Sequence, residues 1–93
     1  MYLKKIDLYI KTHAKTMEIY LEYNEEFSMQ NLSLYTEQSH FEIFDMEAGK
    51  IKTLNGEFGT LTFDVNFHHK VNHIKIIEEI RQLPGILYVR EVA

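Results

Sequence analysis

The most informative stretch of this chain is residues 73–92, which read HIKIIEEIRQLPGILYVREV. Its first half places apolar side chains at helical spacing on one face and charged or polar side chains on the other. The apolar face contains Ile76, Ile77, Ile80 and Leu83, with Ile74 near it. Asn72 is a good N-cap, and Pro84-Gly85 ends the helix because proline cannot continue it and glycine readily adopts a left-handed conformation. The pattern predicts a helix over residues 72–83, followed by a strand, ILYVREV.

Immediately upstream, the pair Asn55-Gly56 predicts a β-hairpin. Asn-Gly favours a two-residue hairpin turn because both residues tolerate positive φ. In the second arm, apolar and polar residues alternate from Thr60 to Phe67, which is the period of a strand. The first arm begins near Phe41, and the glycine of Ala48-Gly49 predicts a β-bulge or local bend there.

The N-terminal half contains one more strand and one more helix. Residues 16–23, TMEIYLEY, alternate in the same way and predict a half-buried strand. The next segment predicts a helix from about residue 27 to 38, with Asn24 or Ser28 as its N-cap. Its expected stripe contains Phe27, Leu34 and Asn31, and it is broadened by Met29, Leu32 and Tyr35.

The resulting order, β-α-β-β-α-β, is that of the ferredoxin-like fold. We therefore expect an α+β, two-layer sandwich with a four-stranded antiparallel sheet and both helices on one sheet face. The 93 residues suffice for one domain, which we place at residues 16–93. Residues 1–15 precede it as a basic amphipathic leader, in which the spacing of apolar side chains predicts a short helix over residues 2–13.

Charge is distributed unevenly along the chain. The leader carries four lysines and one aspartate, a net charge of +3, whereas residues 16–93 carry six basic and thirteen acidic residues, a net charge of −7. An acidic body repels phosphate backbones, so nucleic-acid binding is not expected. The basic leader either keeps an exposed helix solvated or lies near anionic lipid headgroups. No apolar run approaches the roughly 20 residues of a membrane-spanning helix, and we expect the chain itself to be soluble.

Most catalytic signatures are absent, and no cysteine is present for a disulfide or a thiolate metal site. The one cluster with possible chemistry is FHHKVNH, which contains His68, His69 and His73. His69 and His73 have i, i+4 spacing, but the cap at Asn72 places His69 before the helix, and no carboxylate is close in sequence. These histidines are candidate ligand-binding or pH-sensing residues. We expect neither a metal nor a cofactor, and no enzymatic activity.

Residues 16–92 resemble an ACT-type regulatory domain, above all through the ending HIKIIEEIRQLPGILYVREV. The leader and first strand, YLKKIDLYIKTHAKTMEIYLEY, are similar to the point where MgtC/SapB-type proteins leave their last membrane helix and enter a cytoplasmic ACT-like domain. In ACT domains that bind amino acids, the loop after the first strand carries glycine. Here that loop contains Asn24 and Glu25 and no glycine, and these two complete the candidate ligand-binding residues.

The resemblance implies a regulatory or protein-interaction domain on the cytoplasmic side of a bacterial inner membrane. Such proteins are linked to growth at low magnesium and to virulence. The implied partners are a second copy of the domain or the membrane portion of the same protein, which would lie N-terminal to this chain. Tyr20 with Phe44 or Tyr88 is expected on an exposed sheet face. The alternatives are an amino-acid-sensing ACT domain and a ferredoxin-like enzyme of acylphosphatase type, for which the acidic loop is unfavourable.

Overall fold

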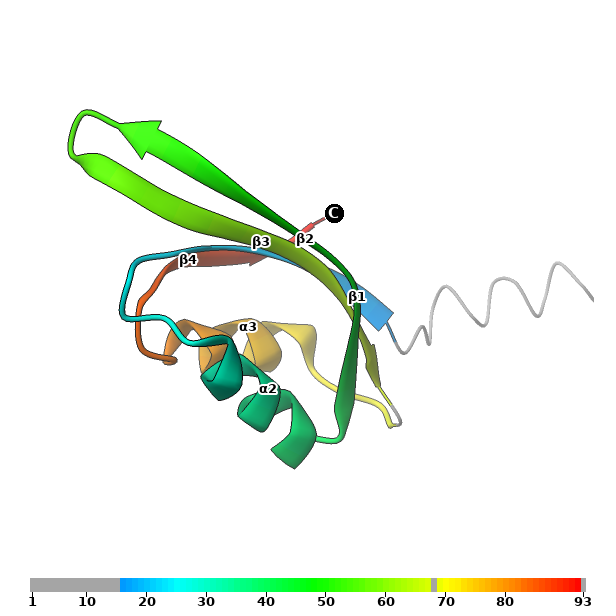
Figure 1. Ribbon diagram of the computed structural model, residues 1–93. Helices are drawn as coiled ribbons and strands as arrows, with labels where there is room; N and C mark the ends of the chain where they lie inside the picture. The colour runs from blue at the N-terminus through cyan, green and yellow to red at the C-terminus, as the bar shows by residue number, and fades with distance from the viewer. Residues whose placement is uncertain (1–15, 68, 93) are drawn as a thin grey trace, which may run out of the picture.

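The computed structural model describes residues 16–67 and 69–92. The described elements are β1 (Thr16–Tyr23), α2 (Met29–Gln38), β2 (Phe41–Thr53), β3 (Gly56–Phe67), α3 (His73–Arg81) and β4 (Ile86–Glu91). The four strands form one antiparallel sheet in the order β2-β3-β1-β4, and both helices cover the same face of it (Figure 1). The predicted ferredoxin-like βαββαβ sandwich is therefore confirmed. The helix expected over residues 2–13 lies outside the described residues.

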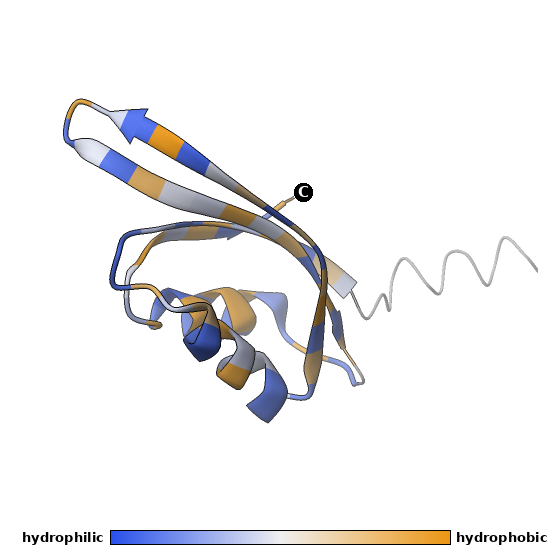
Figure 2. Ribbon diagram, viewed as in Figure 1, coloured by the Kyte–Doolittle hydropathy of each residue, from blue (hydrophilic) through white to orange (hydrophobic). Residues whose placement is uncertain are grey.

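The core lies between the sheet and the two helices. Hydrophobic and hydrophilic bands alternate along the strands (Figure 2), and the apolar set faces the helices. The buried side chains are Met17, Ile19, Leu21, Leu32, Leu61, Phe63, Val65, Phe67, Ile76, Ile80 and Val89. The central strands β1 and β3 supply most of them, because only central strands are flanked on both sides and covered by both helices.

The start of helix α2 and its buried residues differ from the prediction. It begins at Met29, since Ser28 is the N-cap and its hydroxyl accepts a hydrogen bond from the Gln30 amide. Phe27 therefore precedes the helix, and the buried positions of α2 are Leu32 and Thr36, while Leu34 is exposed. Helix α3 also begins one residue later than expected, with Asn72 confirmed as its N-cap, and Ile74 is exposed on the side away from the core.

The β2–β3 hairpin turns one residue before the predicted pair. Thr53 pairs with Gly56, so the two loop residues are Leu54 and Asn55, and Gly56, at φ +132°, is the first residue of β3. The predicted bulge at Ala48-Gly49 is wrong, because Gly49 is in register opposite Thr60. The register shift lies between Phe44 and Glu47, where two residues of β2 face one of β3. Asp45 has φ +53° there, a conformation that aspartate tolerates better than most residues.

The hairpin is longer than the strands beside it. Strand β1 pairs with β3 only from Thr16 to Tyr23, opposite Asn66 to Gly59. The tip of the β2–β3 ribbon therefore extends past the body of the sheet, as Figure 1 shows. Among the described strands, β2 pairs only with β3, so its other edge is unpaired along its 13 residues.

Candidate functional site

The five candidate ligand-binding residues do not form one site. Asn24 and Glu25 lie in the β1–α2 loop, at the end of the molecule where β4 begins. His69 and His73 lie where β3 leads into α3, at the opposite end of the two helices (Figure 1). His68 lies outside the described residues. The loop pair and the histidines can therefore take part only in separate sites.

His69 and His73 both have structural partners. The ring of His69 stacks on Phe41, with 6.3 Å between ring centroids. Nδ1 of His73 lies 3.0 and 3.1 Å from the two carboxylate oxygens of Glu91, which ties the start of α3 to the end of β4. Within residues 16–67 and 69–92, no group of three or more His, Asp or Glu side chains is placed to hold a metal ion. Both histidines therefore connect one element of the fold to another.

Asn24 and Glu25 line a hollow of about 360 Å³ at the root of the β2–β3 ribbon. Its other lining residues are Tyr23, Lys50, Glu57, Phe58 and Gly59. Nζ of Lys50 lies 3.4 Å from Oε1 of Glu57, and the Tyr23 ring packs on Gly59, where a side chain would overlap it. Positively and negatively charged side chains thus lie together beside aromatic rings, an arrangement that suits a small zwitterion.

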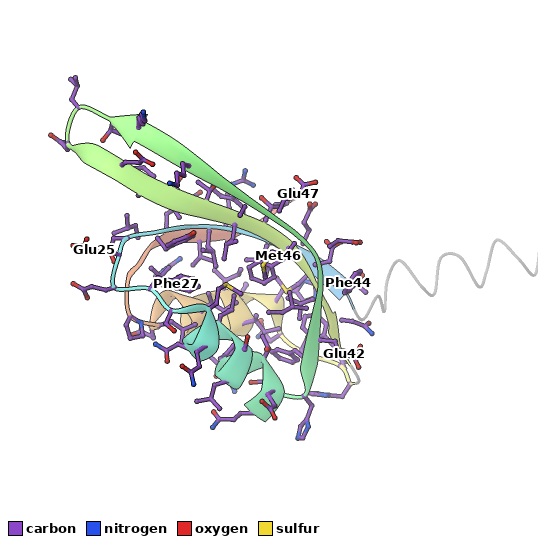
Figure 3. All side chains as sticks on the ribbon, viewed as in Figure 1. Glu25, Phe27, Glu42, Phe44, Met46 and Glu47 are labelled. Carbon is purple, nitrogen blue, oxygen red and sulfur yellow. The ribbon has the colours of Figure 1, made fainter. Side chains whose placement is uncertain are left out.

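The backbone of this loop is held by internal hydrogen bonds. The Asn24 amide donates to the carbonyl of Gly85, and the Phe27 amide donates to the carbonyl of Asn24. The Asn24 side-chain oxygen accepts from the Glu26 amide. Figure 3 shows Glu25 on the outside of the loop and Phe27 turned inward, where its ring lies 4.6 Å from that of Tyr23. Asn24 therefore shapes the turn, and Glu25 is the residue that presents a free side chain.

A second surface is the face of the sheet that carries no helix, here called the open face. Residues paired across neighbouring strands point to the same face, so the register defines its members. Where β3 is paired with β1, the side chains of the open face are those of Thr16, Glu18, Tyr20, Glu22, Glu42, Phe44, Glu47, Thr60, Thr62, Asp64, Asn66, Tyr88 and Arg90. No described segment covers this face, and Figure 3 shows Phe44 and Glu47 pointing away from the helices.

Aromatic side chains occupy the β1 and β4 side of the open face. The rings of Tyr20 and Tyr88 meet edge to face at 6.3 Å, and the guanidinium of Arg90 lies 5.2 Å from the centre of the Tyr20 ring. The Tyr20 hydroxyl donates to Oε2 of Glu22 at 2.7 Å, and this hydrogen bond, with burial, raises the pKa of Tyr20. Tyr88 is 45% exposed here, and Phe44, on β2 at the other side of the open face, is 41% exposed, so apolar surface remains available to a partner on both sides.

Carboxylates occupy the other side of the open face, around the β2 bulge. A hollow of about 460 Å³ is lined by Glu18, Asp45, Met46, Glu47, Thr62 and Asp64. The bulge brings Asp45 and Met46 into the lining of this hollow. The register places Glu18, Asp64 and Phe44 side by side across three strands. Sequence reasoning did not find this hollow. The outward positions of Glu18 and Asp64 are readable from strand alternation, but their closeness depends on which strands pair.

The fold and these surfaces define a ferredoxin-like α+β domain with an uncovered, acidic and aromatic sheet face. Comparison with family models, with curated proteins and with solved structures gives no match to this chain. In the described part of the chain, no helix has the length and apolar character needed to cross a membrane.

Proposed function

We propose that this chain is a non-enzymatic regulatory or protein-interaction domain that acts through the open face. The observation that carries this proposal is the combination of exposed Phe44 and Tyr88 with carboxylates on a sheet face that no described segment covers. Aromatic side chains provide contact area at low entropic cost, and the surrounding charges select partners of opposite sign. A surface of this kind suits a protein partner better than a small ligand, which is usually bound in a concave and mostly apolar pocket.

We further propose that the domain is the cytoplasmic, ACT-like end of an MgtC/SapB-type bacterial inner-membrane protein linked to growth at low magnesium and to virulence. The support is the sequence resemblance over residues 73–92 together with a strand and helix order that suits it. The membrane portion of the same protein is then the partner, joined through the segment that precedes β1. In that case the gene should continue upstream, in the same reading frame, with several apolar membrane-spanning segments.

The second candidate is an amino-acid-sensing domain. The hollow at Asn24 and Glu25 favours it, because Lys50 could pair with a carboxylate and Glu25 or Glu57 with an ammonium group. Against it stands the ion pair between Lys50 and Glu57, which already satisfies one charge of each sign. Lys50 is also largely exposed, so a ligand there would be poorly desolvated.

An acylphosphatase-type enzyme is the least supported alternative. That chemistry needs a loop after β1 whose amide groups bind phosphate. In this chain the amides of Asn24, Glu26 and Phe27 all donate within the protein, and two glutamates follow Asn24. Most backbone amides of this loop are therefore not available to bind an anion, and the negative charge of the glutamates repels a phosphate group.

The proposed function predicts a growth phenotype for changes on the open face. In the organism that encodes this chain, Phe44→Ser combined with Tyr88→Ser should abolish growth at low magnesium, because the partner loses its main apolar contacts. Each of these surface changes should alter the free energy of unfolding by about 1 kcal/mol or less, which thermal melts check. Leu34→Ser, on the exposed side of α2, is the matched control and should grow normally. Normal growth of the open-face variant would refute the proposal.

The fold also predicts weak self-association, through the free edge of β2. Two open faces packed together would place carboxylates against carboxylates, whereas the unpaired edge of β2 offers backbone groups to a second strand. Sedimentation of the full chain at ~100 μM should show a dimer fraction that rises with concentration, as expected of a contact in this affinity range. A purely monomeric profile at that concentration counts against this prediction.

A further inference from the structure

Strand β4 forms the second edge of the sheet, and no described strand pairs with its outer side. A hollow of about 410 Å³ lies between this edge and α3, and its lining includes Ile74, Ile77 and Arg81 of α3. Ile74, Leu87 and Tyr88 are three of the eight large apolar side chains that the described domain leaves exposed. The outer side of β4 with the Ile74, Ile77 and Arg81 side of α3, here called the β4 edge, therefore combines unpaired backbone groups with apolar surface.

The backbone groups of β4 alternate in direction. The Val92 amide donates to the carbonyl of Glu18 at 2.8 Å, which continues the antiparallel ladder between β4 and β1. In such a ladder every second residue turns its amide and carbonyl to the neighbouring strand. Those of Arg90 therefore turn to β1, whereas those of Val89 and Glu91 turn outward. A further strand can pair with these outward groups without any change in the sheet.

A second copy of β4 fits this edge when a two-fold axis passes through Val89. The outward amide and carbonyl of Val89 then bond to those of Val89 in the second copy, as in any antiparallel ladder. Directly opposed residues share a face, and this register sets Tyr88 opposite Arg90 of the second copy on the open face. Arg90 already makes such a contact, since its guanidinium lies 5.2 Å from the centre of the Tyr20 ring. The register thus adds an attractive pair on each side of the axis.

Helix α3 fits the same axis. Nδ1 of His73 lies 3.0 Å from Oε2 of Glu91, which fixes the start of α3 beside the end of β4. From this point, two residues back along β4 to Val89 span about 7 Å, and roughly four to five residues along α3 span the same length. The axis therefore passes beside Ile77, which is only partly buried, and two antiparallel α3 helices would cover this side chain.

Charges on the β4 edge complement those of a second copy. Arg81, in the last turn of α3, has no ion-pair partner among the described residues. The axis sets it opposite Ile74 of the second copy, beside the Glu91 carboxylate that contacts His73 there. A two-fold contact occurs twice, so each copy supplies one guanidinium and one carboxylate. An extended peptide would pair with the strand alone and would leave Arg81 and Ile77 uncovered.

We propose that a second copy of this chain binds the β4 edge, so that two four-stranded sheets join into one antiparallel sheet with the helices of both copies on one side. The pairing goes beyond the proposed function and does not depend on it. It also differs from the weak association expected at β2, which is the opposite edge of the sheet and is interrupted by the bulge at Asp45. One consequence is that the two open faces become one continuous surface with two-fold symmetry.

Sedimentation of the full chain tests the contact through the sign of a charge at position 74. Ile74 is 70% exposed, so substitutions there should not disturb the fold. Ile74→Lys sets a second cation against Arg81 of the other copy and should raise the dimer Kd roughly tenfold above that of Ile74→Glu, which gains an ion pair. In the Arg81→Glu background the order of the two variants should reverse. Leu34→Lys and Leu34→Glu, on the exposed side of α2, are the matched controls and should have equal Kd values.

Amide hydrogen exchange of the full chain locates the contact. In the dimer the Val89 and Glu91 amides should exchange slowly, and dilution or Ile74→Lys should release them, whereas the Arg90 amide, which turns to β1, should stay protected. A chain that stays monomeric at ~100 μM, equal Kd values for Ile74→Lys and Ile74→Glu, or a dimer protected along β2 instead would overturn the inference. In each of these cases, loss of growth in the Phe44→Ser, Tyr88→Ser variant would still support the proposed function.

Discussion

Phe63→Ala is expected to lower the free energy of unfolding by about 3–5 kcal/mol, the usual cost of removing a buried phenylalanine ring. Phe63 is completely buried in the middle of β3, which is a central strand, and lies opposite the equally buried Ile19. The helices on one side and the neighbouring strands cannot close on the cavity without shifting the sheet. For a domain of this size the loss corresponds to a fall in melting temperature of more than about 12 °C.

Phe44→Ala is the matched control for this measurement. It removes the same atoms one strand away, but the Phe44 side chain is 41% exposed on the open face. Its expected cost is about 1 kcal/mol, because less apolar surface is lost and no cavity forms. Chemical denaturation of the two variants under one buffer checks the difference. Equal costs would contradict the assignment of Phe63 to the core and of Phe44 to the open face.

Gly85→Ala is expected to cost about 2–5 kcal/mol, for two reasons that add. Gly85 has φ +82°, which disfavours any side chain. In addition, a Cβ there would overlap the backbone of Glu26 and Phe27. The Gly85 carbonyl also accepts the hydrogen bond of the Asn24 amide, at 2.9 Å. The substitution therefore pushes apart the α3–β4 turn and the β1–α2 loop, which no side-chain rotation can relieve.

Gly56→Ala separates the two contributions. Gly56 also has a positive φ, of +132°, but no atom lies within 4 Å of its would-be Cβ. Its cost is therefore conformational alone, about 1–3 kcal/mol. Amide resonances of residues 24–27 should move in Gly85→Ala and stay in place in Gly56→Ala. A smaller loss of stability for Gly85→Ala than for Gly56→Ala would show that the two loops are not in contact as described.

The parts of the fold that were predicted correctly depend on neighbours in sequence. Asn72 caps α3 because a cap needs only its own side chain and the next few amides. The hairpin turn was predicted to within one residue, since Asn55 lies in the turn and Gly56 begins the next strand. The α2 stripe was predicted less well. Ser28 rather than Asn24 is the cap, so the helix starts at Met29. Of the predicted stripe Leu32 is buried, together with Thr36, whereas Leu34 is exposed. Two caps within five residues both satisfy local rules, and packing against the sheet decides between them.

The Tyr35 hydroxyl shows how tertiary contact changes a residue that looks merely apolar in sequence. It donates to Oε1 of Glu79 at 2.8 Å, which joins α2 to α3. Burial and this hydrogen bond raise the pKa of Tyr35 well above its ordinary value. Because the folded-state pKa lies above that of the unfolded chain, this contact stabilises the fold up to about pH 10 and is lost as the pH rises further.

The sequence alone determined the order of strands and helices, their approximate ends, and which strand residues point inward. These follow from periodicity and from the conformational limits of residues such as Pro84 and Gly85, which act over a few bonds. Only the tertiary structure decided that Asn24 and His73 lie at opposite ends of the helices, that the bulge lies at Asp45, and that Glu18, Asp64 and Phe44 are neighbours. Strand pairing joins residues that are tens of positions apart, and its register is chosen by the packing of the whole core, so no local pattern contains it.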